Sequence, residues 1–302
     1  MMSTIPKMLE TEYPGVYQAS DKSSKSAQFY YTLIIASDLS AMILAALISI
    51  YNYSSNESKQ SVYIVSGFFL LAGLVMSIIV LTMKFEDTWY QGRALAESCK
   101  TLTWRFMTCS ELFENNLTTQ EVEIRFVNRI TALSTKFTHL NKVMDSKLLN
   151  LDLISTHMQN VRNLTLDDRK VYYIDNRLKD QKDWYSKKAT FNKNKYKLWF
   201  GVIIISQTLS IIAITILIVY PASNWNLVGL FTTLASSAIS WLQLKQHQEL
   251  KQAYTTATQE LNSILALSNT ISTENTFSEF VLDSENAISR EHTMWLAQKR
   301  TA

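Results

Sequence analysis

Four long stretches of this chain hold a single charged side chain between them, Asp38, and this limits its possible folds more than any other feature. A helix needs about 20 mostly apolar residues to cross a membrane. A soluble protein would have to bury all four stretches as core helices, and their length favours a membrane instead. We therefore predict four helical spans, at 27–51, 61–83, 198–220 and 225–244, with Pro221 in the loop that separates the last two.

Composition agrees with this interpretation. Charged residues make up 18% of the chain, whereas about a quarter is usual in soluble proteins. Tyrosine and tryptophan gather near the ends of the predicted spans, where amphipathic rings favour the membrane–water interface. The residues concerned are Tyr30, Tyr31, Tyr51, Tyr63, Trp199, Tyr220, Trp225 and Trp241.

The distribution of basic residues predicts the orientation, because lysine and arginine are enriched on the cytoplasmic side. The loop between the first two spans carries only Lys59, and the loop between the last two carries no basic residue, whereas the segment 84–197 carries twenty. We therefore expect both termini and all the bulky soluble parts in the cytoplasm. Cys99 and Cys109 lie in these parts and are expected to be free thiols.

The soluble parts are predicted to be helical, since the chain has only six glycines and three prolines. The second span is expected to continue as a helix to about residue 113. Thr118 then opens a helix with Glu121 in a capping box. An apolar stripe that follows is expected to pack against neighbouring helices. Its members are Val122, Phe126, Ile130, Leu133, Phe137, Leu140 and Met144.

Three more helices are expected. Thr165 opens one, with Asp168 three residues later, and it runs into the third span. The fourth span is expected to continue to about Leu267, and a last helix to begin near Ser278. The predicted fold is thus all-α, with four transmembrane helices in two hairpins and a cytoplasmic bundle formed by helix extensions. The two halves of the chain have similar hydropathy patterns, which suggests a loose internal duplication. We therefore predict three segments: a cytoplasmic tail at 1–26 and two-span halves at 27–150 and 151–302.

Polar motifs flank the spans in a set order. They comprise Asp21, Ser24, Gln28 and Tyr31 before the first span, Arg93, Glu97 and Lys100 after the second, Arg177 before the third, and Glu285, Arg290 and Glu291 in the tail. Together these motifs resemble those of the SLATT family of bacterial membrane proteins. The first half is similar to one SLATT type and the second half to another, as in two-domain fusions.

The resemblance implies a function. SLATT proteins are proposed effectors of bacterial conflict and antiphage defence systems, which form pores or disrupt the inner membrane when a partner senses infection. It implies a location in the bacterial inner membrane and a trigger from a sensor protein or a nucleotide second messenger. A homo-oligomer is expected, because a single four-helix unit has little room for an aqueous path. An alternative is a non-conducting scaffold that recruits a soluble sensor through its helical bundle.

Asp38 is the first candidate for a mechanistic role, because an ionised carboxylate near the centre of a span costs about 2.5–3.5 kcal/mol on insertion scales. It could be a pore or gating group, or a neutral structural group bonded to Ser66, Ser206, Gln207 or Ser210. Ser206, Gln207 and Ser210 are themselves candidates to line or gate a pore. Small residues four apart also predict close helix packing on this span. They are Ser37, Ala41 and Ala45.

Other polar positions leave two interpretations open. Hydroxyls in the fourth span could line a wet pathway or bond to their own backbone; they include Thr233, Ser236, Ser237 and Ser240. The charged motif residues could form ion pairs within the bundle or bind an anionic signal.

The sequence favours neither an enzyme nor a nucleic-acid-binding protein. The four histidines are scattered, and none pairs at the spacing of metal ligands. No glycine-rich phosphate loop or nucleophile motif is present. Basic residues flank the predicted spans and do not suit a groove-reading patch. We therefore expect no catalytic residues, metal or cofactor, and the lipid bilayer as the main partner.

Overall fold

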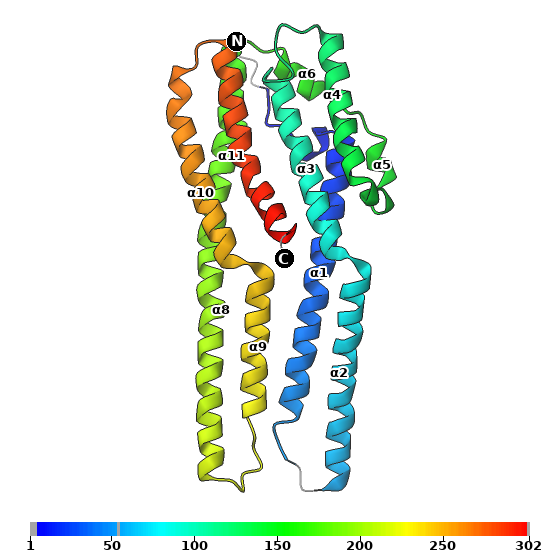
Figure 1. Cartoon of the computed structure of the whole chain (residues 1–302), viewed down its shortest axis with the longest axis vertical. Coiled ribbons are helices and arrows are strands. Elements are labelled where there is room, and N and C mark those ends of the chain that lie inside the picture. Colours follow the sequence, from blue (N-terminus) through cyan, green and yellow to red (C-terminus); the bar gives the residue numbers. More distant parts are fainter. Residues whose placement is uncertain (1–4, 53–54, 301–302) are drawn as a thin grey trace. The chain divides into compact units, whose positions relative to one another are not determined.

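The computed structural model describes residues 5–52 and 55–300, with side chains described up to residue 289. Within these residues the regular secondary structure is helical, apart from one isolated β-bridge. It divides into two compact units (Figure 1). We call Phe29–Phe85 with Thr190–Lys251 the apolar unit, and Met1–Gln28 with Glu86–Ala189 and Gln252–Ala302 the polar unit.

The apolar unit is built from parts of four helices. They are α1 (Gly15–Ile48), α2 (Asn56–Met83), α8 (Asp180–Val219) and α9 (Val228–Lys245). Three helical stretches are long and apolar enough to cross a membrane: α1, α2 and the continuous helix Leu166–Val219 that includes α8. Only 11–17% of their most apolar windows is buried within the chain, so the exposed apolar faces need a nonaqueous environment.

The fourth predicted span corresponds to α9, which differs from the other three. It has 18 residues, and it is not among the helices that satisfy the criteria of length and hydropathy for a span. Its threonine and serine residues, together with Gln243 and Lys245 at its end, make it less apolar than α2. Three of the four predicted spans thus coincide with helices that are long and apolar enough to cross a membrane, and a crossing by α9 remains a proposal.

The two helix pairs of the apolar unit are tied together where their loops meet. Tyr51 and Trp225 form an antiparallel β-bridge, and their rings lie 4.9 Å apart. The amide of Asn52 donates to the carbonyl of Asn224 at 2.7 Å, and the amide of Asn226 donates to that of Ile50 at 2.8 Å. This bridge satisfies backbone groups that would otherwise be unpaired in the loops.

Two helices that were predicted to run on without interruption are broken. Lys84 has a φ of 48° and separates α2 from α3 (Phe85–Met107). Gln246 has a φ of 46° and separates α9 from α10 (His247–Ala266). Both breaks can be followed in the ribbon (Figure 1). A left-handed residue ends a helix locally, but glycine usually occupies it, so a lysine and a glutamine left no signal in the sequence.

The polar unit contains α3, most of α10 and several further helices. These are α4 (Thr119–Ser134), α5 (Ser146–Leu149), α6 (Thr156–Arg162), α7 (Leu166–Tyr173) and α11 (Glu274–Arg300). Its core is rich in aromatic side chains, with Phe106 lying 4.9 Å from Phe126 and 6.0 Å from Phe113, centroid to centroid. All three rings are at most 1% exposed.

Both predicted capping residues in this unit are confirmed. Thr118 accepts from the amide of Glu121, whose carboxylate bonds back to the amide of Thr118. Thr165 accepts from the amide of Asp168 in the same way and opens α7. The helix that α7 begins continues to Val219, as predicted.

The apolar stripe 122–144 packs as expected but is not one helix. Val122, Phe126 and Ile130 are buried on α4. The helix ends at Ser134, and a 3-10 segment (Thr135–Lys142) follows, in which Phe137 has a φ of −124° and leaves the helical region. The side chains beyond the break still contact the core, because Leu140 is fully buried and Met144 packs against the same cluster.

Candidate functional site

Asp38 lies at the contact between α1 and α2. The hydroxyl of Ser77 on α2 donates to its carboxylate at 3.3 Å. Gly73 leaves room for that carboxylate, because a Cβ at this position would lie 2.8 Å from Asp38 Oδ1. The hydrogen-bond partner is therefore on the second span, at a position that was not among the candidates Ser66, Ser206, Gln207 and Ser210. Helical periodicity within one span cannot identify which neighbour faces it.

Small side chains line the same contact. Ala41 and Ala45 are 6% and 5% exposed, and Ser37 is half-buried. Farther along the pair, the hydroxyls of Ser49 and Ser66 lie 3.3 Å apart. Ser37 and Ala41 also border an open groove between α1 and α2. The predicted small-residue positions thus lie where the two helices approach each other.

The other polar candidates in the apolar unit lie on both inward and outward faces. Ser206 and Ser237 are buried, and Ser210 is half-buried. Thr233 donates to the carbonyl of Gly229 at 2.8 Å, which is the backbone bonding expected of hydroxyls inside a helix. Three candidates are exposed on outward faces: Gln207, Ser236 and Ser240.

A buried ion pair occupies the interior of the polar unit. Arg177 contacts both carboxylate oxygens of Glu285, with Nε–Oε1 at 2.9 Å and Nη2–Oε2 at 2.8 Å. Each residue is 1% exposed. Glu285 also accepts from the hydroxyl of Thr101 at 2.8 Å and from that of Tyr173 at 3.0 Å. Its carboxylate is well satisfied, whereas Arg177 Nη1 is buried without a hydrogen-bond partner among the described residues.

The local helix geometry positions Arg177. It lies in a π-helical stretch, Ile174–Lys179, between α7 and α8. Such wider turns are rare and occur frequently at functional sites. Burial alone would lower the pKa of Arg177, but attraction to Glu285 and the hydrogen bonds between them raise it above its ordinary value. The guanidinium is therefore charged at any physiological pH.

Aromatic and basic side chains surround this pair. The guanidinium of Arg177 lies 5.9 Å from the ring of Trp104, whose indole N–H donates to the hydroxyl of Tyr13 at 3.0 Å. The ammonium of Lys100 lies 5.8 Å from the Tyr13 ring and 5.9 Å from the Tyr17 ring. Burial lowers the pKa of Lys100, and repulsion from Arg177 lowers it further. Burial also raises the pKa of Tyr13.

Three other charged motif residues, Asp21, Arg93 and Glu97, form ion pairs within their own helices. Arg93 contacts Glu97 at 3.2 Å on α3, and Asp21 contacts Lys25 at 2.6 Å on α1. Such pairs at a spacing of four residues contribute about 0.2–0.5 kcal/mol. Arg290 and Glu291 lie in the part of α11 whose side chains are outside the described residues.

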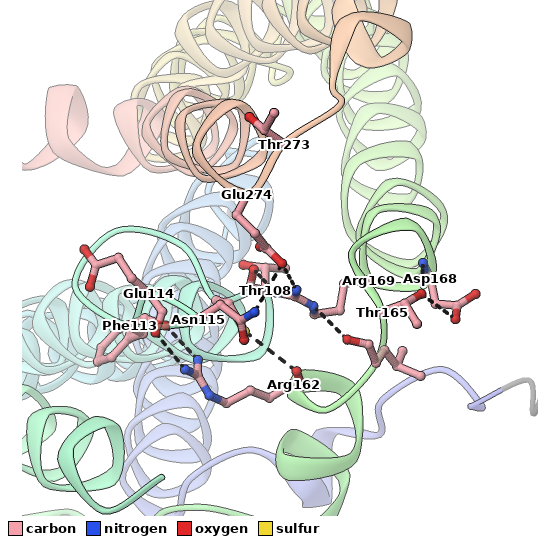
Figure 2. Close-up of polar contacts among 12 residues, drawn as sticks. Thr108, Phe113, Glu114, Asn115, Arg162, Thr165, Asp168, Arg169, Thr273 and Glu274 are labelled. Atoms are coloured by element: carbon pink, nitrogen blue, oxygen red, sulfur yellow. Dashed lines mark hydrogen bonds and ion pairs between the residues drawn. The ribbon is translucent and has the colours of Figure 1, made fainter. Parts of the chain in front are cut away.

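A second arginine cluster, which was not predicted from the sequence, holds the loop between α3 and α4 (Figure 2). Arg162 donates to the carbonyls of Phe106 and Phe113, both at 2.8 Å, and to that of Glu114 at 3.1 Å. Arg169, which is 1% exposed, donates to the carbonyl of Thr108 at 3.1 Å and contacts the carboxylate of Glu274.

This cluster satisfies backbone groups in a loop with unusual dihedral angles. Cys109 and Leu112 have φ values of 54° and 77°. The carbonyls of the neighbouring residues Phe113 and Thr108 accept from Arg162 and Arg169 (Figure 2). The sequence carries no signal for this arrangement, because arginines in a polar helical segment are usually exposed. The two free cysteines are buried, and burial raises the pKa of Cys99 to about 12 and that of Cys109 above its usual value.

Neither cluster suits metal binding. No group of three or more His, Cys, Asp or Glu side chains is placed to hold a metal ion in the part of the chain that the structure describes. The residues that converge are arginine, lysine, tyrosine and tryptophan around one glutamate, which favours ion pairing and ring contacts.

Comparison with protein-family models gives two matches in tandem. The model described as SMODS and SLOG-associating 2TM effector domain 3 matches residues 14–170, and effector domain 1 of the same series matches residues 173–295. No curated protein and no solved structure gave a match. The predicted division at 150 and 151 is not tested by these matches and stays a prediction. With both models in tandem over nearly its whole length, this membrane protein belongs to the SLATT family of two-transmembrane effector domains.

Proposed function

We propose that this protein is the membrane effector of a bacterial conflict or antiphage defence system, and that it forms a gated oligomeric pore in the inner membrane. The observation that supports oligomerisation most directly is the exposed amide of Gln207, near the middle of the apolar part of α8. Four spans from one chain leave little room for an aqueous path, so the pore requires several copies.

The amide of Gln207 needs a hydrogen-bond partner in a nonaqueous environment. A carboxamide transferred to hydrocarbon without a hydrogen-bond partner costs roughly 2–7 kcal/mol, depending on the reference state. The nearby Thr208 satisfies its hydroxyl with the carbonyl of Ile204 at 2.9 Å. Gln207 is exposed on α8, so in this proposal its amide is satisfied by a second copy or by water in a pore. Bonds between helices in membranes contribute about 1–2 kcal/mol in peptide models.

Exposed hydroxyls on α9 support the same proposal. Ser236 and Ser240 are four residues apart and share an outward face. In this proposal they line the water-filled lumen of the oligomeric pore. Asp38, held at the α1–α2 contact by Ser77, acts as a gating group that changes partner when the two helices separate.

The polar unit is proposed to receive the trigger in the cytoplasm. The family description associates these effector domains with SMODS and SLOG. A soluble sensor or a nucleotide second messenger is the proposed trigger for this chain. In the alternative, a non-conducting scaffold, the polar unit would recruit the sensor while the spans only anchor it. Apolar side chains exposed on α4, Ile124 and Val127, favour a docking role for this unit in either case.

The test is membrane depolarisation in cells that express the chain with the products of its neighbouring genes. We expect the wild type to collapse the membrane potential and Gln207→Leu to reduce the leak roughly tenfold, as expected for losing about 1.4 kcal/mol of association free energy. Thr208→Val is the matched control, because it removes a hydroxyl that bonds only to its own helix.

Two results would count against the pore. One is equal leakage by Gln207→Leu and the wild type at equal membrane levels. The other is full protection of cells against phage infection by a variant whose spans are replaced with an unrelated hairpin. That result would favour the scaffold.

A further inference from the structure

The lysines that precede the third predicted span have no acidic neighbours in the sequence, unlike the lysines that precede the first span. Between Asp183 and Glu249 the sequence has no acidic residue. The approach to the first span, by contrast, includes Asp21 beside Lys22 and Lys25. The second hairpin is therefore flanked by positive charge alone.

Ion pairing increases this difference. Lys22 contacts Asp145 at 2.8 Å and Lys25 contacts Asp21 at 2.6 Å, so the first approach is largely neutralised. Near the second hairpin, Lys193 and Lys197 are exposed on α8. In the described part of the chain, neither these two nor Lys195 forms an ion pair with a carboxylate.

The lysines lie near a junction where α8 is bonded to the start of α10. The ammonium of Lys195 lies 5.7 Å from the ring of Phe191, and that of Lys245 lies 4.9 Å from the ring of Trp241. Buried Asn192 on α8 bonds to His247 at the start of α10, with Oδ1–Nδ1 at 2.7 Å. The positive groups are therefore displayed on elements that are fixed to each other within the apolar unit.

The position along α8 identifies the partner. Lys197 directly precedes the apolar stretch that begins at Leu198, and Lys193 lies four residues earlier on the same face. At 1.5 Å rise per residue, the Cα atoms of both lysines lie within about 8 Å of the start of the hydrocarbon-facing stretch along the helix axis. Trp199 and Trp241, with ring centroids 6.0 Å apart, mark the interface level. A phosphate diester in a lipid headgroup occupies this depth.

We propose that Lys193 and Lys197, together with Lys195 on another side of α8, bind anionic phospholipid headgroups, and that the approach to the first span has no counterpart. Each lysine close to an anionic membrane surface contributes about a fivefold preference for anionic over neutral lipids. Lysine stems bury against the helix while the ammonium reaches the headgroup phosphates. The inference requires insertion of the second hairpin in a membrane but does not depend on pore formation.

The test measures which lipids contact the reconstituted full chain. Spin-labelled phosphatidylglycerol and phosphatidylcholine are compared in phosphatidylcholine vesicles by the fraction whose motion the protein restricts. We expect the wild type to prefer phosphatidylglycerol at least about fivefold at low salt. Replacing Lys193, Lys195 and Lys197 with glutamine is expected to remove most of that preference.

A matched control replaces three lysines that already pair with carboxylates: Lys7, Lys22 and Lys25. This variant is expected to keep the wild-type preference. High salt provides a readout without mutation, because screening of exposed charges at 1 M should abolish the preference of the wild type. The proposal is overturned if the wild type shows no preference, if salt leaves the preference unchanged, or if both triple variants lose it equally.

Discussion

Replacing Glu285 with alanine is expected to lower the free energy of unfolding of the polar unit by about 3–5 kcal/mol, because it leaves a buried charge uncompensated. Arg177 would lose both hydrogen bonds to the carboxylate while remaining in the interior. Thr101 and Tyr173 would lose their acceptor as well. Denaturant unfolding in detergent, followed by circular dichroism, measures the effect.

Two variants control this prediction. Glu279→Ala changes an exposed carboxylate on the same helix and is expected to stay within about 0.5 kcal/mol of the wild type. The double variant Arg177→Met with Glu285→Leu removes both charges and is expected to recover much of the stability. A single Glu285→Ala variant as stable as Glu279→Ala would show that the pair is not buried in the native protein.

The substitution Arg169→Met is expected to have the second large effect and to lower the free energy of unfolding by about 2–4 kcal/mol. The substitution leaves the carbonyls of Thr108 and Leu164 without their donor and removes the contact to Glu274. Because Arg169 is 1% exposed, water cannot easily replace it. We also expect faster proteolysis within the loop between α3 and α4, which Arg169 holds (Figure 2).

Arg129→Met is the matched control, since Arg129 is exposed on α4. Its unfolding midpoint and cleavage rate are expected to remain close to those of the wild type. Equal cleavage of the loop in both variants would contradict the role assigned to Arg169.

The membrane spans could be predicted from the sequence because they depend on local composition. A charge-free run of more than 20 residues, as in α2, has few stable environments other than a bilayer. The breaks at Lys84 and Gln246 could not be predicted, because the left-handed residue that ends a helix is usually a glycine, and neither of these residues is one. Hydropathy is a weaker guide to the shorter α9, because its serine and threonine side chains lower the mean hydropathy of the helix.

The candidate site residues also divide into those that the sequence identified and those that required the structure. The motif residues around the spans were identified without a structure, and Arg177 and Glu285, 108 residues apart, form one buried pair. The partner of Asp38 and the role of Arg169 required the structure, because each depends on which helix lies opposite. Periodicity reveals the face of a helix but not the residue that it meets.

The most direct test of this account is whether all four apolar helices cross the membrane. Single cysteines at Glu57, Ala222, Gln248 and Glu279, all exposed positions, are labelled with a membrane-impermeant maleimide; the native Cys99 and Cys109 are buried. We predict labelling at Glu57 and Ala222 in intact cells, and at Gln248 and Glu279 only after the inner membrane is permeabilised. Labelling of Ala222 and Gln248 from the same side would contradict the account, because α9 would then not cross.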